Sequence, residues 1–437
     1  MDQFKNKKIA VIGGGLEGKS SVEFFKRNGA DVEIRDQNQG EDYLEDLEKF
    51  DLIIRSPGVK LSDLEGKVDR KKISSQTKIF MDLCPCAVIG VTGTKGKGTT
   101  SSLIYEMLKA EGRDAYLGGN IGVPPLDFLE KLTSNSWVVL EMSSFQLADL
   151  EKSPHIAVML MVTSEHMDYH NDINEYVESK RNILSHQTEN DFAIVNRDYP
   201  PSNESDILTE GKVYYVSRER EVEEGCFALG NQVILRTNGN SIPIIDTREL
   251  LLRGDHNQEN VCAATIAAYL AGVRVGTIIK TLQSFKGLEH RLELVAKING
   301  VEYYNDSFST TPETAIAAIK SFKNPEILVL GGSTKNSDFA ELGKVIGEAE
   351  NIKAIIQIGE EWNRIKAEIK TVRPETLIIE GAKNMEQVIT AASKIAVSGD
   401  VVILSPAAAS FDKFKNYKDR GNQFKEQVFK LKENSAQ

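Results

Sequence analysis

The sequence is poor in cysteine, in proline and in long apolar segments. Four cysteines among 437 residues are too few for a disulfide framework, and 12 prolines disfavour a low-complexity chain. No apolar run approaches the roughly 18 residues of a membrane span. Lys and Arg number 53 against 64 Asp and Glu, and the net charge of −11 argues against non-specific binding to nucleic acid or anionic membranes. We therefore expect a cytoplasmic protein with neither of these partners.

The cysteines give no metal site either. Cys84 and Cys86 are separated only by Pro85, and no second pair completes a zinc site. We interpret them as buried or linker thiols in a reducing compartment.

The order of predicted elements indicates three α/β domains. At a prior of roughly 150 residues per domain, the length allows about three. Short apolar strands alternate with amphipathic helices, which predicts mainly parallel, doubly wound (Rossmann-like) sheets. Boundaries are expected near residues 84 and 292, giving domains 1–84, 85–292 and 293–437. Short strands over 191–250 predict a small β insertion in the central, P-loop-type domain.

The first motif is a glycine-rich turn between a strand (8–12) and a helix. Gly13, Gly15 and Gly18 form G-x-G-x-x-G, and Asp36 ends the next strand, where an acid can hold a ribose hydroxyl. In isolation the pattern favours NAD. It is also compatible with close packing of helix on strand, or with another nucleotide in the same crevice. Because a stronger nucleotide-binding motif follows, we favour another nucleotide over NAD as the ligand of this crevice.

The second motif, VTGTKGKGTTS at 91–101, follows the strand at 86–91 and opens a helix. Its glycines let backbone N–H groups approach phosphate oxygens, and Lys97 would meet the β- and γ-phosphates. The strict Walker pattern fails, because its first glycine falls at Val91 and Gly98 follows the lysine. Thr99 or Thr100 must therefore supply the Mg²⁺-binding hydroxyl. A glycine-lysine loop without a ligand is the less favoured interpretation.

Further polar residues follow the strands of the central domain. Glu141 ends the strand at 137–144, where a carboxylate can coordinate Mg²⁺. His166 and His170 have the i, i+4 spacing of zinc ligands but lack the H-E-x-x-H glutamate. Lys180 looks from periodicity like a solvated helix residue. Asn257 and Asn260 could bind a base edge, although capping explains Asn257 equally well.

Taken together, these motifs resemble the Mur ligases, in order and in spacing and over essentially the whole chain. The motifs that carry the resemblance are Gly93-Thr94-Lys95-Gly96-Lys97, Glu141 to Leu147 (EMSSFQL), Glu165-His166-Met167-Asp168, Asn257 to Asn260, His290-Arg291, Asn305-Asp306-Ser307 and Leu404-Ser405-Pro406. The SSFQL run, the Gly119-to-Gly122 turn and the tail SPAAASFDKFKNYKDRGNQF are similar to the member that adds glutamate to UDP-N-acetylmuramoyl-L-alanine.

The resemblance implies an ATP-dependent amide-bond ligase of peptidoglycan precursor synthesis. The N-terminal domain would bind the UDP-sugar substrate, the central domain would bind ATP, and the C-terminal domain would bind the amino acid. The protein would act as a monomer. The substrate's alanine carboxylate attacks the γ-phosphate of ATP, and the amine of glutamate displaces phosphate from the acyl phosphate. Such a transfer needs charge neutralisation, which Lys97, Arg291 and two Mg²⁺ ions would supply.

The resemblance also implies roles for individual residues. ATP would contact Gly93, Thr94, Lys95, Gly96, Lys97, Gly98, Thr99, Thr100, Asn257, Asn260, Arg291 and Asp306. The UDP-sugar substrate would contact Leu16, Glu17, Asp36, Ser56, Pro57, Gly58, Asn120 and Ser143. Glutamate would be bound by Thr310, Lys335, Ser410 and Tyr417. One Mg²⁺ would bind Glu141 and a loop hydroxyl, taken as Thr99, and the second would bind His166 and a carbamylated Lys180. His166 is also the candidate base for the glutamate ammonium, which makes Lys97, His166, Lys180 and Arg291 the catalytic set.

Two positions depart from the family pattern. Phe308 in NDSFSTT stands where the best-known members carry lysine, and Phe411 in AASFDKF stands where they carry an aliphatic residue. Both fall in the expected amino-acid pocket, so the hand of the glutamate, with D favoured over L, is left to experiment. A folylpolyglutamate-synthase-like ligase is the nearest alternative, because Gly98 follows Lys97. A dinucleotide-dependent oxidoreductase and a non-catalytic nucleotide-binding regulator are alternatives of other classes.

Overall fold

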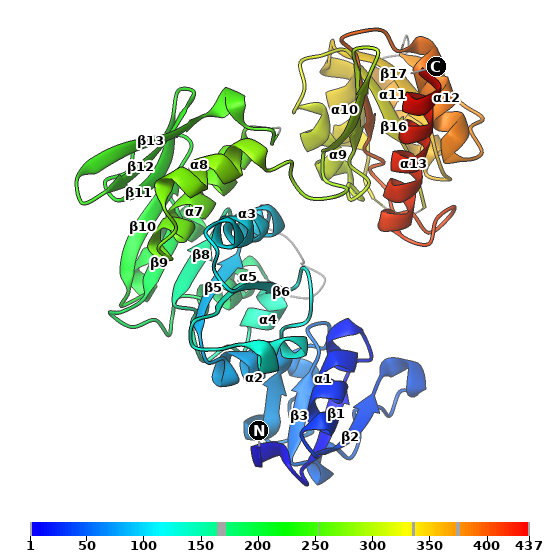
Figure 1. The fold of residues 1–437 in the computed structure, drawn as a ribbon. Coiled ribbons are helices and arrows are strands. Elements are labelled where there is room, and N and C mark those ends of the chain that lie inside the picture. The colour runs from blue at the N-terminus through cyan, green and yellow to red at the C-terminus, as the bar shows by residue number, and fades with distance from the viewer. Residues whose placement is uncertain (1, 164–171, 253, 334–336, 373–375, 436–437) are drawn as a thin grey trace. The chain divides into compact units, whose positions relative to one another are not determined.

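The computed structural model describes residues 2–163, 172–252, 254–333, 337–372 and 376–435. The chain forms two compact units (Figure 1). Unit 1 comprises residues 1–250 with 258–283, and unit 2 comprises residues 251–257 with 284–437. Unit 1 contains a four-stranded and a nine-stranded sheet, and unit 2 contains a six-stranded sheet. Each sheet corresponds to one of the three predicted domains, and the first two lie in one unit.

The N-terminal sheet is parallel, with the strand order β2-β1-β3-β4. Its elements are β1 (Lys8–Ile12), α1 (Leu16–Arg27), β2 (Asp31–Arg35), β3 (Leu52–Arg55), β4 (Ile73–Ser75) and α2 (Gln76–Leu83). The run KIAVI is buried from Ile9 to Ile12, as expected of a strand covered on both faces. The expected boundary near residue 84 falls between α2 and β5, and the division into functional domains stays a prediction.

The central sheet has the order β13-β12-β11-β10-β9-β8-β5-β7-β6. Its parallel part consists of β5 (Ala87–Thr92), β6 (Ala115–Gly119), β7 (Trp137–Glu141), β8 (Ile156–Met159), β9 (Phe192–Asn196), β10 (Lys212–Ser217) and β11 (Gly225–Leu229). The antiparallel strands β12 (Gln232–Thr237) and β13 (Asn240–Asp246) complete it. The helices of this region are α3 (Lys97–Ala110), α4 (Ser144–Leu147), α5 (Ile173–Arg181), α6 (Pro200–Asn203), α7 (His256–Leu270) and α8 (Val275–Ser284).

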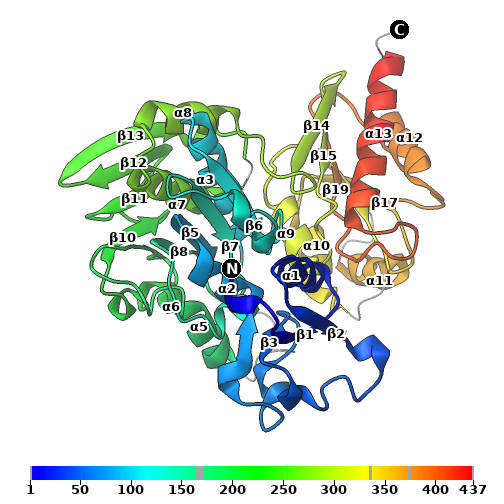
Figure 2. The ribbon, with the colours of Figure 1, turned by 60° about the horizontal axis from the view of Figure 1, so that its bottom comes forward.

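The short strands expected over 191–250 are present, and they continue the central sheet. Strand β9 pairs in parallel with β8, and β10 to β13 follow outward from it (Figures 1 and 2). The sheet that carries the second glycine-rich loop therefore extends through these strands to β13, which is its edge strand.

The sheet of unit 2 has the order β14-β15-β19-β16-β17-β18 and is parallel except for the pair β14-β15. Its elements are β14 (Glu293–Ile298), β15 (Val301–Asn305), α9 (Pro312–Ile319), β16 (Glu326–Leu330), α10 (Ala340–Glu348), β17 (Ile352–Gln357), α11 (Trp362–Val372), β18 (Leu377–Ile379), α12 (Met385–Ile395), β19 (Val401–Leu404) and α13 (Tyr417–Ser435). Helices α12 and α13 lie side by side (Figures 1 and 2).

Strand β14 was not predicted. It forms a hairpin with β15 through Asn299 and Gly300, which both have positive φ, of 50° and 83°. Asn-Gly is the strongest short signal for such a turn, so the signal was present in the sequence. Among the described residues no helix is both long enough and apolar enough to cross a bilayer.

Candidate active site

The second glycine-rich loop lies between β5 and α3, as predicted. Gly93 and Gly96 have φ of 153° and 87°, and a Cβ on Gly96 would lie 2.2 Å from Oδ1 of Asn260. Only glycine fits both the backbone conformation and the space at this position. The ammonium of Lys97 donates to the carbonyls of Gly93 (2.9 Å) and Thr94 (3.0 Å). The Lys97 ammonium is therefore held by the loop's own carbonyl groups, and the turn requires glycine at position 96.

Lys180 is not the solvated residue that its helix periodicity suggested. Its side chain is 1% exposed, and Nζ donates to the carbonyl of Gly93 at 3.0 Å. The ammonium also lies 4.6 Å from the ring centroid of Tyr176, one turn earlier in α5. Lys97 and Lys180 therefore converge on one carbonyl oxygen of the loop.

Glu141 ends β7 with a carboxylate that is 4% exposed. Oε1 accepts a hydrogen bond from Nδ2 of Asn120 at 2.8 Å, whereas Oε2 has no hydrogen-bond partner among the described residues. A buried carboxylate oxygen without a donor is costly unless a cation or water faces it. Because β5 and β7 are parallel neighbours, Glu141 and the loop lie at the same edge of the sheet.

The two candidate loop hydroxyls differ in their surroundings. Thr100 is fully buried, and its hydroxyl donates to Oδ1 of Asn260 at 3.3 Å. Thr99 is half-buried. Thr99 is therefore the more available hydroxyl for a metal ion. Asn257, at the start of the same helix as Asn260, is also buried.

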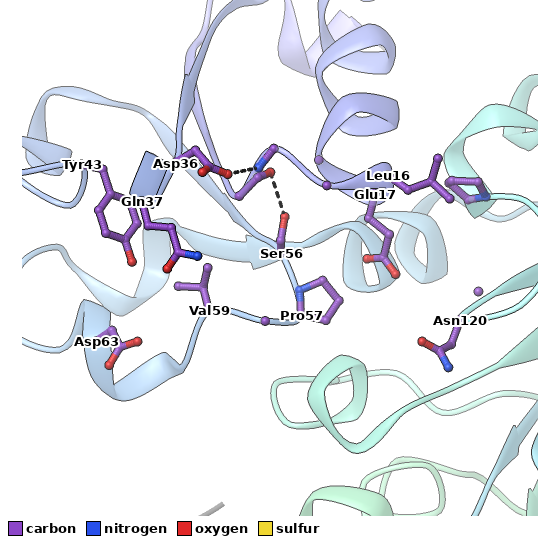
Figure 3. Close-up of a pocket in the computed structure, with 17 residues that line it drawn as sticks. Leu16, Glu17, Asp36, Gln37, Tyr43, Ser56, Pro57, Val59, Asp63 and Asn120 are labelled. Atoms are coloured by element: carbon purple, nitrogen blue, oxygen red, sulfur yellow. Dashed lines mark hydrogen bonds between the residues drawn. The ribbon is translucent and has the colours of Figure 1, made fainter. Parts of the chain in front are cut away.

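A cavity of about 520 Å³ lies at the carboxyl ends of β1 and β3, beside the first glycine-rich loop (Figure 3). All the residues expected to bind the UDP-sugar substrate line it except Ser143: Leu16, Glu17, Asp36, Ser56, Pro57, Gly58 and Asn120. Three of its lining residues are acidic, namely Glu17, Asp36 and Asp63, and no lysine, arginine or histidine is among the described residues that line it. The predicted residues therefore share one cavity, which has an acidic lining.

The three glycines of this loop have separate structural roles. A Cβ on Gly13 would lie 2.8 Å from Ser56, and one on Gly18 would lie 1.9 Å from the carbonyl of Gly13. These two glycines allow the turn and the close approach of α1 to β1. A Cβ on Gly15 would meet nothing within 4 Å, so Gly15 faces open space in the cavity lining.

Asp36 organises the loop. Its carboxylate accepts from the N–H of Gly14 at 2.6 Å (Figure 3). It also accepts from the N–H of Asn38 at 3.0 Å. The hydrogen bonds from Asn38 and Gly14 lower the pKa of Asp36. The anion is thus stabilised on the turn from which the cavity opens.

Glu17 is the unusual acid of the cavity. Burial raises its pKa to about 7, and a hydrogen bond from Gln146 and the charge of Arg55 only partly oppose that effect. Nε2 of Gln146 donates to Oε1 of Glu17 at 2.6 Å. Ser143, which does not line the cavity, caps α4, and its hydroxyl donates to Oε1 of the same Gln146 at 3.1 Å.

Asn120 joins the cavity to Glu141. Its side chain lines the cavity, and its amide is the donor to the Glu141 carboxylate. The turn that presents it requires Gly119, where a Cβ would lie 2.2 Å from the Glu141 carbonyl. The cavity and the loop edge of the central sheet are therefore connected through one side chain.

In unit 2, Arg291 and Asp306 lie close together. Asp306 accepts from the hydroxyl of Ser405 at 2.8 Å and from the N–H of Leu292 at 3.1 Å. Burial raises the pKa of Asp306 to about 7, against the effects of Ser405, of Leu292 and of the Arg291 charge. The Arg291 guanidinium lies over the ring of Phe308, 3.9 Å from its centroid.

Of the described residues expected to bind glutamate, Thr310 lies between β15 and α9, Ser410 lies between β19 and α13, and Tyr417 begins α13. Phe308 packs edge-on against Tyr417, with ring centroids 5.0 Å apart, and Ser410 is buried. Thr310 is half-buried. Lys335 lies outside the described residues, as does His166. Phe411, the second departure from the family pattern, is 71% exposed.

Several residues of the site were missed from the sequence. Gln146 holds Glu17, Arg55 is buried with Asp149 at 3.1 Å, and Arg420 donates to Ser307 and to the carbonyls of Ala408 and Ala409. The Ser143-x-x-Gln146 capping box signals a fixed Gln146. No local pattern identifies Arg55 or Arg420, because their partners come from distant segments.

Comparison with known proteins places these features in one family. Residues 91–268 match the Mur ligase middle domain, and residues 290–408 match the Mur ligase, glutamate ligase domain. The UDP-N-acetylmuramoylalanine–D-glutamate ligase of Acetivibrio thermocellus is 38% identical over 98% of this chain and 97% of its own. The enzyme of the same name from Ruminiclostridium cellulolyticum is 35% identical over 99% of both chains. The fold is similar to that of MurF ligase from Thermotoga maritima, solved with ADP, with a TM-score of 0.60 at 19% identity over 99% of this chain and 100% of that one.

Proposed function

The chain belongs to the Mur ligase family, and we propose that it joins D-glutamate to UDP-N-acetylmuramoyl-L-alanine at the expense of ATP. The product would be a peptidoglycan precursor, made in the cytoplasm. The relatives that carry this name match over nearly the full length of the chain. This extent argues against a folylpolyglutamate-synthase-like ligase and against the oxidoreductase and regulator alternatives.

The observation that carries the proposal is the position of Asn120 between the cavity and Glu141. A substrate with its nucleotide at the first glycine-rich loop would extend past Asn120 toward the loop of Lys97. Its terminal carboxylate would then meet a phosphoryl group held by that loop. An N–H donor at Asn120 suits a peptide carbonyl or carboxylate.

The chemistry follows from the charges at the phosphate loop. An oxygen of the alanine carboxylate bonds to the γ-phosphorus of ATP, and the bond from that phosphorus to the ADP oxygen breaks. The amine of glutamate then attacks the acyl carbon, loses a proton and releases phosphate. Lys97 stabilises negative charge on the transferring phosphoryl group. Asn257, Asn260, Arg291 and Asp306 remain proposed contacts of ATP.

The residues present fit a magnesium ion. Oε2 of Glu141 is buried without a donor among the described residues, and Thr99 is half-buried in the first turn of α3, which follows the phosphate loop at the same edge of the sheet. Hard oxygen ligands of this kind are what Mg²⁺ binds beside phosphates. A bound Mg²⁺ would neutralise charge on the phosphates. His166 and a carbamylated Lys180 are the proposed ligands of a second ion.

Carbamylation of Lys180 is supported by its position. The side chain is buried and its nitrogen already lies beside the phosphate loop. The Lys180 ammonium first loses a proton. Addition of CO₂ to the resulting neutral amine forms an N–C bond and releases a second proton, so that the original cation becomes an anion. The remaining N–H of the carbamate can still donate to the Gly93 carbonyl.

The glutamate site is proposed in unit 2. Ser410, Thr310 and Lys335 would hold the carboxylates, and Tyr417 would form one wall. Phe308 packs on Tyr417 and Arg291. A phenyl ring at this position would make that wall more apolar than the lysine expected from the family pattern. The hydroxyl donors and Lys335 remain to select a dicarboxylate.

Phosphate release tests the reaction and the amino acid together. The protein is assayed with ATP, Mg²⁺, UDP-N-acetylmuramoyl-L-alanine and a panel containing D-glutamate, L-glutamate, glutamine and leucine. We expect release with D-glutamate and little with glutamine or leucine, because each unpaired donor in the site costs about 1–3 kcal/mol. Preference for L-glutamate would overturn the hand. Absence of release with every amino acid would overturn the proposed reaction.

A further inference from the structure

Two cysteines face each other in the linker between the N-terminal and central sheets. Cys84 follows α2 and Cys86 precedes β5, and their Sγ atoms are 3.6 Å apart. Both side chains are partly exposed. The interpretation of Cys84 and Cys86 as buried or linker thiols does not account for this contact. The feature is independent of the proposed ligase reaction.

The surroundings give the two thiols different acidities. The hydrogen bond with Cys86 lowers the pKa of Cys84 to about 7, and the charge of Lys152 adds to the effect. Lys152 is fixed there, because Nζ donates to the carbonyl of Met81 at 2.7 Å. The hydrogen bond with Cys84 raises the pKa of Cys86, and Asp114 adds to that shift. Cys84 is therefore expected to be the attacking nucleophile, and Cys86 the resolving thiol that displaces the small thiol from Cys84.

The other two cysteines provide a comparison inside the same chain. Cys226, in β11, and Cys262, in α7, are fully buried. Hydrogen bonding with Cys226, together with burial, raises the pKa of Cys262. A thiol pair that is fully buried is inaccessible to oxidants in the solvent. A hydrogen bond between two thiols is thus shared by both pairs, whereas exposure to solvent distinguishes Cys84 and Cys86 from Cys226 and Cys262.

We propose that Cys84 and Cys86 form a redox-active dithiol, a site that small-molecule disulfides convert into an intramolecular disulfide across Pro85. The Cys84 thiolate attacks one sulfur of the small disulfide and releases one thiolate. Cys86 loses its proton and attacks the Cys84 sulfur, which releases the second thiolate. The protein thiols lose two electrons and two protons in total, and the small disulfide is reduced to two thiols.

The location gives the reaction a structural consequence. The linker follows α2, whose Gln76 donates to the Glu17 carbonyl at 2.9 Å, and leads into β5, which ends at the phosphate loop. A disulfide across Pro85 would rigidify the linker that joins the N-terminal sheet to the central sheet within unit 1. A bond that spans one residue departs from relaxed disulfide geometry and should be easily reduced again.

The test uses the full-length protein in buffers of defined ratios of oxidised to reduced glutathione. After alkylation of free thiols, peptide mass spectrometry identifies each cysteine. We expect a Cys84–Cys86 disulfide at oxidising ratios, reversed by excess reduced glutathione, while Cys226 and Cys262 are alkylated only after unfolding. The variant Cys86→Ser should stop at a mixed disulfide of glutathione with Cys84, and Cys84→Ser should react at least several-fold more slowly.

A second probe keeps the result decisive. Phenylarsine oxide, which needs two adjacent thiols, should bind the native wild-type protein in a one-to-one ratio and bind neither single variant. Circular dichroism before treatment establishes that each variant is folded. Mixed disulfides on both cysteines without a bond between them would overturn the proposal, and so would failure of the native protein to bind the arsenical.

Discussion

Unit 1 contains two glycine-rich loops of the same local design and of opposite charge. Each follows a buried parallel strand and opens a helix, α1 in one case and α3 in the other. In the first loop the glycines allow tight packing, and acidic side chains surround the opening. In the second loop the ammonium groups of Lys97 and Lys180 both reach the carbonyl of Gly93.

The comparison separates two roles in anion binding. Glycines give the backbone its shape, and that shape alone brings N–H groups toward a phosphate. The charges of the side chains around the turn then determine how strongly the site stabilises negative charge on the ligand. The second loop is equipped to stabilise charge that develops during a reaction, whereas the first holds a ligand without such help. We therefore expect the second loop to serve catalysis and the first to serve recognition.

Of the substitutions considered, removal of the Lys97 side chain should reduce catalysis the most. Lys97→Ala is expected to lower kcat by about 100-fold or more, with a smaller loss of ATP affinity, because backbone N–H groups still hold the nucleotide. Initial rates at saturating and limiting ATP separate the two effects. Lys109→Ala, on an exposed position of the same helix, is the matched control. A Lys97→Ala variant with a near-normal rate would remove catalysis from the second loop.

The next effect concerns Lys180. Lys180→Ala is expected to lose about as much activity as Lys97→Ala if a carbamate supplies a metal ligand. Short carboxylic acids such as acetate should restore part of the activity of Lys180→Ala and none of that of Lys97→Ala, because only the first variant lacks an anion. Rates are measured across an acetate series at fixed ionic strength. Equal rescue of both variants, or of neither, would count against the carbamate.

Local sequence patterns predicted the shape of the first loop better than the contacts between the side chains around it. The roles of Gly13 and Gly18 follow from a pattern of adjacent residues, and the structure has both in contact with their expected neighbours. Local periodicity failed for Lys180, although Tyr176 and Val177 lie one turn before it and mark a buried face. The interaction of Gln146 with Glu17 joins residues 129 positions apart. Such a contact depends on how two sheets pack, which no local pattern encodes.

The acidic lining of the first cavity leads to a pH-dependent prediction. With a pKa of about 7, Glu17 is partly ionised in the free protein at neutral pH. Arg55, buried beside Asp149, is the charged group that opposes this shift. A diphosphate in the cavity disfavours the Glu17 anion, so its binding should take up a proton. Affinity should then fall above pH 7 by up to about tenfold per pH unit and level off below pH 6.

Calorimetric titration with UDP in buffers of different ionisation enthalpy measures that uptake directly. The wild-type protein should take up a fraction of a proton at pH 7 and more at pH 8. Glu17→Gln should bind UDP with almost no pH dependence, whereas Glu23→Gln, on an exposed position of α1, should behave as wild type. UDP binding without proton uptake would show that binding does not change the protonation of Glu17, and would overturn this prediction. Absence of UDP binding would instead count against the proposed substrate.

Glu326, a buried carboxyl away from the first cavity, distinguishes the effect of burial from a role in ligand binding. Glu326 begins β16 in unit 2 and is fully buried. Its Oε1 accepts a hydrogen bond from Asn351 at 3.0 Å, whereas Oε2 has no hydrogen-bond partner in the described part of the chain. Burial raises its pKa to about 8, and the Asn351 hydrogen bond only partly opposes the shift. Because the folded-state pKa lies above the unfolded value, this group favours folding at low pH. The contribution is lost as the pH rises from about 4.5 through 8.

Glu326→Gln should therefore stabilise unit 2 at pH 8.5, by about 1–2 kcal/mol, and change little at pH 5, where the wild-type carboxyl is protonated and isosteric with the amide. Thermal unfolding at the two pH values measures the difference, and UDP titration should find binding unchanged. This outcome would set Glu326 apart from Glu17, whose substitution alters binding. An equal effect of Glu326→Gln at both pH values would mean that packing, rather than ionisation, limits this site. It would also weaken the assignment of a raised pKa to Glu17, because both assignments rest on the same cost of burying a carboxylate.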